Sequence, residues 1–312
     1  MPNTTKGSFS NFRDKFASSS ISVSYSPMLE QLDRKKYPEL DAWIRSENQR
    51  TESTLKSSPM FDQLQRDLKK EAQLSLSTSE FFLREKSYLR LDRSEEFPDG
   101  IFYLGPSDFS SEAEPCFVIA DMKSFFGVSV QFSSVEFFES SLALFHFSIE
   151  GKDVTKTREY DLVKKCWLEQ NPFLLPESRG EAKYFSKDII LFTQSLPMDE
   201  LSDAKGSRKI RQWNRGQTIE DAKVLFEAPK NILKVWFSID KKSSKILAGI
   251  LRSWNQTEYF ILNGEHPPIS MNIPVLWNYL GVFKSYLILQ VTENNSDFIK
   301  GDVVLYHLDH HK

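Results

Sequence analysis

The sequence is short of the residue patterns that commonly carry catalysis or metal binding. No two of its 12 glycines stand four positions apart, so the 312 residues contain no G-x-S-x-G nucleophile elbow. Gly100 and Gly105 have the glycine spacing of a phosphate-binding loop, but Pro106 follows where that loop requires lysine. H-E-x-x-H and C-x-x-C patterns are also absent. No residue carries a catalytic signature, and we expect neither a cofactor nor a metal.

The sequence also has only two cysteines, a small net charge and no long apolar run. Cys116 and Cys166 follow no ligand spacing, so we expect two free, buried thiols in a cytoplasmic protein. A net charge of −3 gives no strong attraction to nucleic acid or to an anionic membrane. No apolar run reaches the roughly 18 residues of a spanning helix. The Ser-rich residues 1–27 have no apolar signal core and are expected to form a disordered leader, with a transit peptide as the alternative.

The five histidines do not form a recognisable site. His146 alternates with Phe145 and Phe147, so it faces the other side of a strand; without a nameable carboxylate partner it is interpreted as structural rather than as a base. His307, His310 and His311 gather near the C-terminus. They are interpreted as part of a polar tail, with a metal site as the alternative.

The segment 28–72 has the periodicity of helices. Apolar residues recur at three–four spacing from Leu40 through Trp43 to Leu55, and again from Phe61 to Leu68. Ser58-Pro59 interrupts the pattern, because proline has no N–H for a helix interior. The sequence therefore predicts two helices in this segment.

Beyond residue 78 the apolar period changes to two. Short apolar runs are separated by turn-forming clusters such as Pro98-Asp99-Gly100 and Asn294-Asn295-Ser296. The runs cover residues 81–83, 101–104, 116–120, 126–132, 142–149, 188–192, 222–226, 233–239, 245–251, 257–262, 286–291 and 302–308. Without long intervening helices, this pattern predicts a mainly β domain over 78–312, as a sandwich, barrel or propeller.

The stretch 207–230, SRKIRQWNRGQTIEDAKVLFEAPK, shows how neighbouring residues predict a strand, a turn, a helical turn and a second strand. Ile210–Trp213 fits a strand, and Arg215-Gly216 ends it because glycine readily adopts positive φ. Thr218 resembles a helix N-cap, with Asp221 three residues on. Residues 224–226 then predict a second strand. Trp213, Trp236 and Trp254 are expected to be buried anchors of the sheets.

Three segments resemble the prolyl oligopeptidase family of serine peptidases. LDAWIRSENQRTESTL (40–55) is similar to the family's N-terminal helix, and GSRKIRQWNRGQTIEDAKVLFE (206–227) to a propeller segment. FIKGDVVLYHLD (298–309) resembles a later strand of that propeller. Met28 and Gln217 depart from the family pattern. The matching residues are Trp43, Asn48, Thr51, Trp213, Arg215, Gly216, Ala222, Phe226 and Glu227.

This resemblance implies a specific architecture. The family's helices pack on an α/β-hydrolase domain that carries Ser, Asp and His, and a seven-bladed propeller restricts access to short peptides. These 312 residues correspond to the helices and about 14 propeller strands. The resemblance therefore implies a partial, open β-propeller of about three to four four-stranded blades, preceded by a short helical segment and truncated before the hydrolase domain.

Three functions remain open at this point. The chain is a truncated or split prolyl-oligopeptidase-type peptidase, inactive alone because no triad is present; a non-catalytic propeller that binds partners; or an unrelated all-β protein. Its expected partners are a separately encoded hydrolase domain or peptide substrates. A further expectation is that the last blade leaves an apolar face exposed. The sequence does not determine the oligomeric state.

Overall fold

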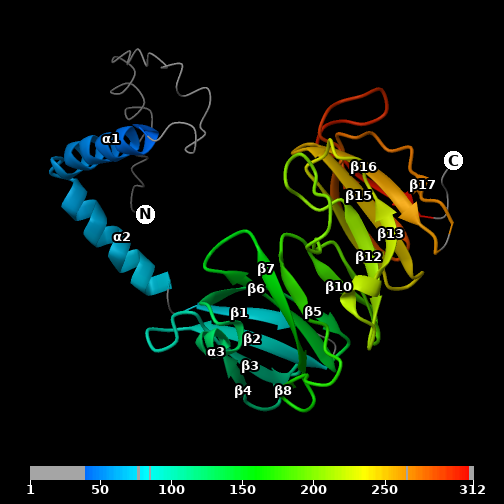
Figure 1. Ribbon diagram of the computed structural model, residues 1–312, viewed down its shortest axis with the longest axis horizontal. Helices are drawn as coiled ribbons and strands as arrows, with labels where there is room; N and C mark the ends of the chain where they lie inside the picture. Colours follow the sequence, from blue (N-terminus) through cyan, green and yellow to red (C-terminus); the bar gives the residue numbers. More distant parts are fainter. Residues whose placement is uncertain (1–38, 76–77, 84–85, 265, 309–312) are drawn as a thin grey trace, which may run out of the picture. The chain divides into compact units, whose positions relative to one another are not determined.

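The structure is a computed structural model that describes residues 39–75, 78–83, 86–264 and 266–308. The chain divides into two compact units, Met1–Gln73 and Leu74–Lys312, which Figure 1 shows in the colours of the sequence. The leader expected over residues 1–27 lies outside the described residues, as do His310 and His311.

The first unit contains the two helices that the sequence predicts. These are α1 (Glu39–Lys56) and α2 (Phe61–Ser75). The break between them contains Pro59, which cannot donate the hydrogen bond that a continuous helix needs there. An i,i+4 pair between Glu52 and Lys56 (2.9 Å) supports the last turn of α1. Neither helix combines the length and apolar character needed to cross a membrane, nor does any other described helix.

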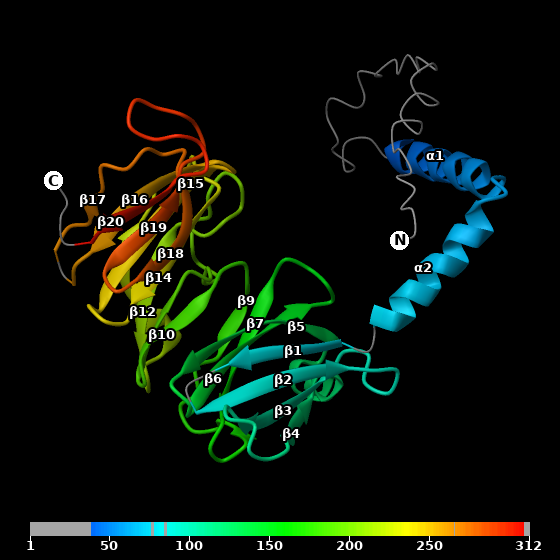
Figure 2. The same cartoon turned by 180° about the vertical axis from the view of Figure 1, so that it is seen from behind.

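The described part of the second unit forms twenty strands in five antiparallel sheets, named A to E (Figures 1 and 2). Sheet A contains β1 (Thr78–Leu83), β2 (Ser87–Arg93), β3 (Ile101–Pro106) and β4 (Glu114–Val118). Sheet B contains β5 (Val130–Phe138), β6 (Leu142–Ile149), β7 (Thr155–Asp161), β8 (Cys166–Trp167) and β9 (Leu175–Ser178). The η3 turn (Ile119–Asp121) and α3 (Met122–Phe126) connect the two sheets.

The remaining strands follow the same order along the chain. Sheet C contains β10 (Ala182–Ser186), β11 (Ile189–Phe192), β12 (Lys209–Asn214) and β13 (Lys223–Glu227), with η4 (Ile219–Asp221) before the last strand. Sheet D contains β14 (Lys234–Asp240), β15 (Lys245–Ser253), β16 (Gln256–Leu262) and β17 (Ile269–Ser270). Sheet E contains β18 (Asn278–Phe283), β19 (Tyr286–Gln290) and β20 (Val303–His307).

Four hydrophobic clusters join consecutive sheets. Strand β6 shows how, because it is buried on both faces. Its residues Ala143, Phe145 and Phe147 pack into the cluster shared with sheet A, whereas Leu142 and Leu144 pack into the cluster shared with sheet C. Two further clusters join sheet C to D and sheet D to E. This series of face-packed antiparallel sheets confirms the predicted mainly β, propeller-type fold.

The described residues contain more sheets than the three to four blades expected. The additional strands are polar in sequence: β7, for example, reads TKTREYD and has no apolar run. Its Thr157 and Glu159 are nevertheless buried, because His146 on β6 and Arg215, which follows β12, satisfy their polar groups. The run 126–132 is also only partly strand, since Phe126 ends α3, Gly127 has φ +76° and the strand begins at Val130.

Candidate functional site

The stretch 207–230 folds as its sequence predicts. Strand β12 ends at Asn214, Gly216 turns the chain at φ +83°, and η4 leads into β13. Thr218 occupies the N-cap position of η4, but its hydroxyl donates to the Asp221 carboxylate at 2.7 Å rather than capping the backbone. Trp213 is 7% exposed, and its indole N–H donates to the Gln217 carbonyl at 3.0 Å. The segment is therefore a rigid connector held by Trp213.

Arg215 has a role that the sequence did not reveal. Its guanidinium forms two 2.8 Å hydrogen bonds to the carboxylate of Glu159, whose side chain is 0% exposed. Glu159 also accepts from the Tyr184 hydroxyl (2.6 Å) and from the Phe173 backbone N–H (3.0 Å). Arg215 in turn lies 4.3 Å from the centre of the Phe173 ring. Together these contacts join sheets B and C through one fully satisfied, buried charge pair.

The pair also alters proton affinities. Burial and then the negative charge of Glu159 raise the pKa of the Tyr184 phenol well above its usual range. Burial alone lowers the pKa of Arg215, but the hydrogen bonds and charge of Glu159 more than offset this and raise it. Both groups therefore keep their protons at neutral pH, which suits a structural tie rather than proton transfer.

The other motif residues lie in or next to sheet C, or on α1. Ala222 and Phe226 are buried in the clusters on either side of sheet C. Glu227 is exposed, and its carboxylate lies 3.2 Å from the guanidinium of Arg208. In the helical unit, Trp43, Asn48 and Thr51 lie on α1 with exposed side chains, Trp43 being 48% exposed.

The expectation of three buried tryptophans is wrong for Trp254. Trp213 is buried and Trp236 is half-buried, but Trp254 is 89% exposed. It lies in the β15–β16 connection, between Ser253 and Asn255. Residues at the tip of a hairpin point away from both faces of the sheet, so no neighbouring sheet covers this side chain. In the sequence, the polar neighbours of Trp254 were the sign that it lies in a turn and not in a buried strand.

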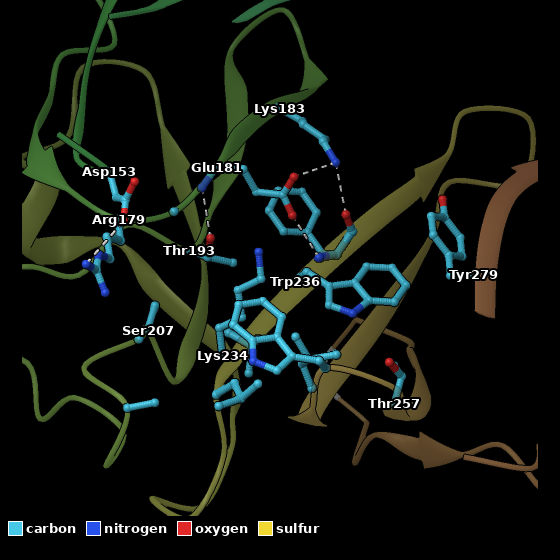
Figure 3. Close-up of a pocket in the computed structure, with 18 of the residues that line it drawn as sticks. Asp153, Arg179, Glu181, Lys183, Thr193, Ser207, Lys234, Trp236, Thr257 and Tyr279 are labelled. Atoms are coloured by element: carbon cyan, nitrogen blue, oxygen red, sulfur yellow. Dashed lines mark hydrogen bonds and ion pairs between the residues drawn. The ribbon is translucent and has the colours of Figure 1, made fainter. Parts of the chain in front are cut away.

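A pocket of about 1000 Å³ runs along the first strands of sheets C, D and E. Figure 3 shows its wall, to which β10 contributes Lys183, β14 contributes Lys234 and Trp236, and β18 contributes Tyr279. Sequence reasoning missed this pocket, because its lining residues come from segments spread between Ser133 and Gln290. Each of these strands lies at the end of its sheet's hydrogen-bonding order, so each presents an unpaired edge.

Two charged side chains cover the unpaired edge of β14. The Glu181 carboxylate accepts from the Phe237 N–H at 3.1 Å, and the Lys183 ammonium donates to the Phe237 carbonyl at 3.0 Å (Figure 3). Glu181 and Lys183 also pair with each other at 2.8 Å. They supply the hydrogen bonds that another strand would make, and they link sheet C to sheet D.

The aromatic part of the pocket wall is held in place by its neighbours. The rings of Trp236 and Tyr279 lie 4.5 Å apart, and the Tyr279 hydroxyl donates to the Ser238 hydroxyl at 2.9 Å. Gly249 lies opposite Trp236 on β15, and a Cβ there would come within 2.1 Å of the indole. Only glycine lets the indole lie against the sheet at this position.

The remaining candidate groups are His146, the two cysteines and His307. His146 is interpreted correctly as a strand-face residue: it is buried, and its Nδ1 lies 2.8 Å from the Thr157 hydroxyl. Burial lowers the pKa of His146 to about 4, so the ring is neutral at pH 7. Cys116 is half-buried, but Cys166 is exposed, which corrects the expectation of two buried thiols. His307 lies on β20, 4.8 Å from the Tyr286 ring. No group of three potential metal ligands occurs in the described ranges.

Comparisons with known proteins agree with this architecture. An uncharacterized peptidase of Rickettsia prowazekii is 31% identical over 161 residues, which are 46% of this chain and 22% of that protein. A post-proline cleaving enzyme from Rickettsia typhi superposes with a TM-score of 0.73 at 21% identity, over 89% of this chain and 45% of that enzyme. No protein-family model matches the chain.

The chain is also similar to a solved structure of a propeller domain. The β-propeller domain of the Trilobed protease from Pyrococcus furiosus matches with a TM-score of 0.50 and 14% identity, over 75% of this chain and 69% of that domain. The resemblance to prolyl oligopeptidases over the helices and part of the propeller is thereby confirmed. The chain spans less than half of the post-proline cleaving enzyme and about a fifth of the curated relative.

Proposed function

We propose that these 312 residues act as the helical and propeller part of a prolyl-oligopeptidase-type serine peptidase. The catalytic Ser, Asp and His are supplied by a hydrolase domain outside this sequence, and the chain does not cleave peptides alone. The observation that carries the proposal is the superposition of 89% of the chain on the post-proline cleaving enzyme.

The geometry of the described residues supports this division of labour. A serine peptidase needs an activated nucleophile, a base and an orienting carboxylate in one place. His146, which is buried in sheet B, is hydrogen-bonded to Thr157 and shielded from solvent. What the propeller unit offers instead is a pocket along the first strands of sheets C, D and E, lined by aromatic and charged side chains. In this proposal the pocket contacts short peptides, and the hydrolase domain cleaves them.

The first test is the DNA that follows the codon of Lys312. The proposal expects coding sequence for G-x-S-x-G and then Asp and His, in the same frame or in a neighbouring gene. If it is absent, the alternative of a non-catalytic binding propeller is favoured, because the pocket exists without the triad.

The second test is activity of the purified 312-residue protein. We expect no hydrolysis of a fluorogenic Gly-Pro substrate and no labelling by a serine-directed fluorophosphonate, because no activated serine is available. The labelling is compared before and after denaturation with heat. A serine that is labelled only in the folded protein contradicts the proposal.

A further inference from the structure

Among the residues that the structure describes, one cation of the pocket has no ion-pair partner, and its position suggests a ligand. Arg179 pairs with Asp153 at 3.5 Å, and Lys183 pairs with Glu181 at 2.8 Å. Lys234 also lines the pocket, but it makes no ion pair or side-chain hydrogen bond with the described part of the chain. The charged side chains of the pocket therefore sum to one uncompensated positive charge.

Lys234 lies next to the aromatic part of the wall. Lys234 and Trp236 are two residues apart on β14, so their side chains leave the same face of the strand, and Figure 3 shows both at the pocket. The ring of Tyr279, on β18, packs against Trp236 at an interplanar angle of 42°. Trp254, which also lines this pocket, is almost fully exposed to solvent. An indole left in water is the kind of side chain that gains burial when a ligand binds.

We propose that Lys234, Trp236, Trp254 and Tyr279 form a subsite for the carboxylate end of a short peptide. The ammonium of Lys234 pairs with the terminal carboxylate, and the three rings contact the last side chains, prolyl rings included. This inference rests on the proposed peptide-handling function, and it adds which end of the peptide the pocket selects. Two of the rings are held in place before any ligand binds: Gly249 leaves room for Trp236 against the sheet, and Ser238 accepts the hydrogen bond of Tyr279. This preorganisation favours binding at the subsite.

Calorimetric titration of the whole 312-residue protein with two matched peptides tests the subsite. The probes are acetyl-Ala-Pro-Ala-Pro as the free acid and as the C-terminal amide. We expect the acid to bind about fivefold more tightly, the gain of a partly exposed ion pair, and the difference to shrink as salt is added.

Variants distinguish an ion pair made by Lys234 from attraction of the peptide by the overall charge of the protein. Lys234→Gln should abolish the preference for the acid and leave the affinity for the amide within about twofold, while Lys234→Arg should keep the preference. Lys241→Gln changes an exposed lysine that directly follows the last residue of β14; it is the control and should leave the preference unchanged. Trp254→Ala should weaken both peptides by about fivefold, because the ring contributes to both complexes.

The results distinguish failure of the subsite from failure of the proposed function. Equal binding of acid and amide, or an acid preference that survives Lys234→Gln, overturns the subsite and leaves peptide binding intact. A preference lost equally in Lys241→Gln also overturns it, because the cause is then long-range charge. Absence of binding by either peptide overturns both proposals. Binding of cellotetraose in place of the peptides assigns the rings to carbohydrate and overturns the subsite.

Discussion

The interface between sheets A and B and the interface between sheets B and C use different chemistry. The first is an aromatic cluster in which Phe145 contacts Phe102 at 5.1 Å and Phe117 at 5.0 Å between ring centres. The second combines apolar residues with the buried Glu159–Arg215 pair and with His146. Aromatic packing is spread over many weak contacts, whereas the buried pair depends on every hydrogen bond being made. We therefore expect the first interface to tolerate substitution and the second to fail abruptly.

The largest expected effect is at the second interface. Arg215→Ala leaves the Glu159 carboxylate buried without its cation, so unfolding free energy should fall by about 3–5 kcal/mol. Urea denaturation followed by tryptophan fluorescence measures it. The matched variant Arg215→Ala with Glu159→Gln should recover more than about 1 kcal/mol of that loss, because the stranded charge is gone. A loss below about 1 kcal/mol for Arg215→Ala alone would show that the pair contributes no more to the unfolding free energy than a surface ion pair does.

The second interface should also weaken in acid. Burial, chiefly, holds the folded pKa of His146 at about 4, below its unfolded value of about 6.5. Between these values the unfolded state binds the extra proton, so stability falls as pH falls from 6.5 toward 4, by up to about 1.4 kcal/mol per pH unit. Above pH 6.5 this contribution is fully present and constant.

Comparison of the native protein with His146→Gln isolates this effect. The variant keeps a polar group near Thr157 but does not titrate, so its stability should change less between pH 6.5 and 5. Urea midpoints at matched pH values provide the measurement. Parallel curves for the two proteins would assign the acid sensitivity to carboxylates elsewhere.

The smallest effect is expected at the first interface. Phe145→Leu should cost roughly 1–2 kcal/mol, because neighbouring rings can partly fill the space and no polar atom loses a partner. The matched substitution for comparison is Phe192→Leu in the cluster of sheets B and C. A loss of more than about 4 kcal/mol for Phe145→Leu would contradict the tolerance attributed to this cluster.

Much of the fold was predictable because local rules agreed with the tertiary structure. Proline marked the break between α1 and α2, and Gly216 marked the turn after β12. Apolar runs located β6, β11, β15 and β16, which are buried in the structure. The polar strand β7 was not predicted, because its buried Thr157 and Glu159 are stable only with partners from other parts of the chain.

The site was less predictable than the fold. The sequence singled out Trp213 and Arg215, and the structure gives both a structural role. It also suggested that Trp254 is buried, which is wrong, and it gave no sign of Lys183 covering the edge of β14. A pocket between sheets depends on side chains from several strands, and alternation along one strand does not say which other strand is its neighbour.

By itself, the sequence determined which segments are helix and which are apolar strand, since periodicity and turn residues act over a few neighbouring positions. Only the tertiary structure decided where charge could be buried. Glu159 and Arg215 are 56 positions apart, and nothing in the sequence indicates that the two side chains meet. A carboxylate is stable at zero exposure only when its partners are already in place, and packing of sheet B on sheet C puts them there.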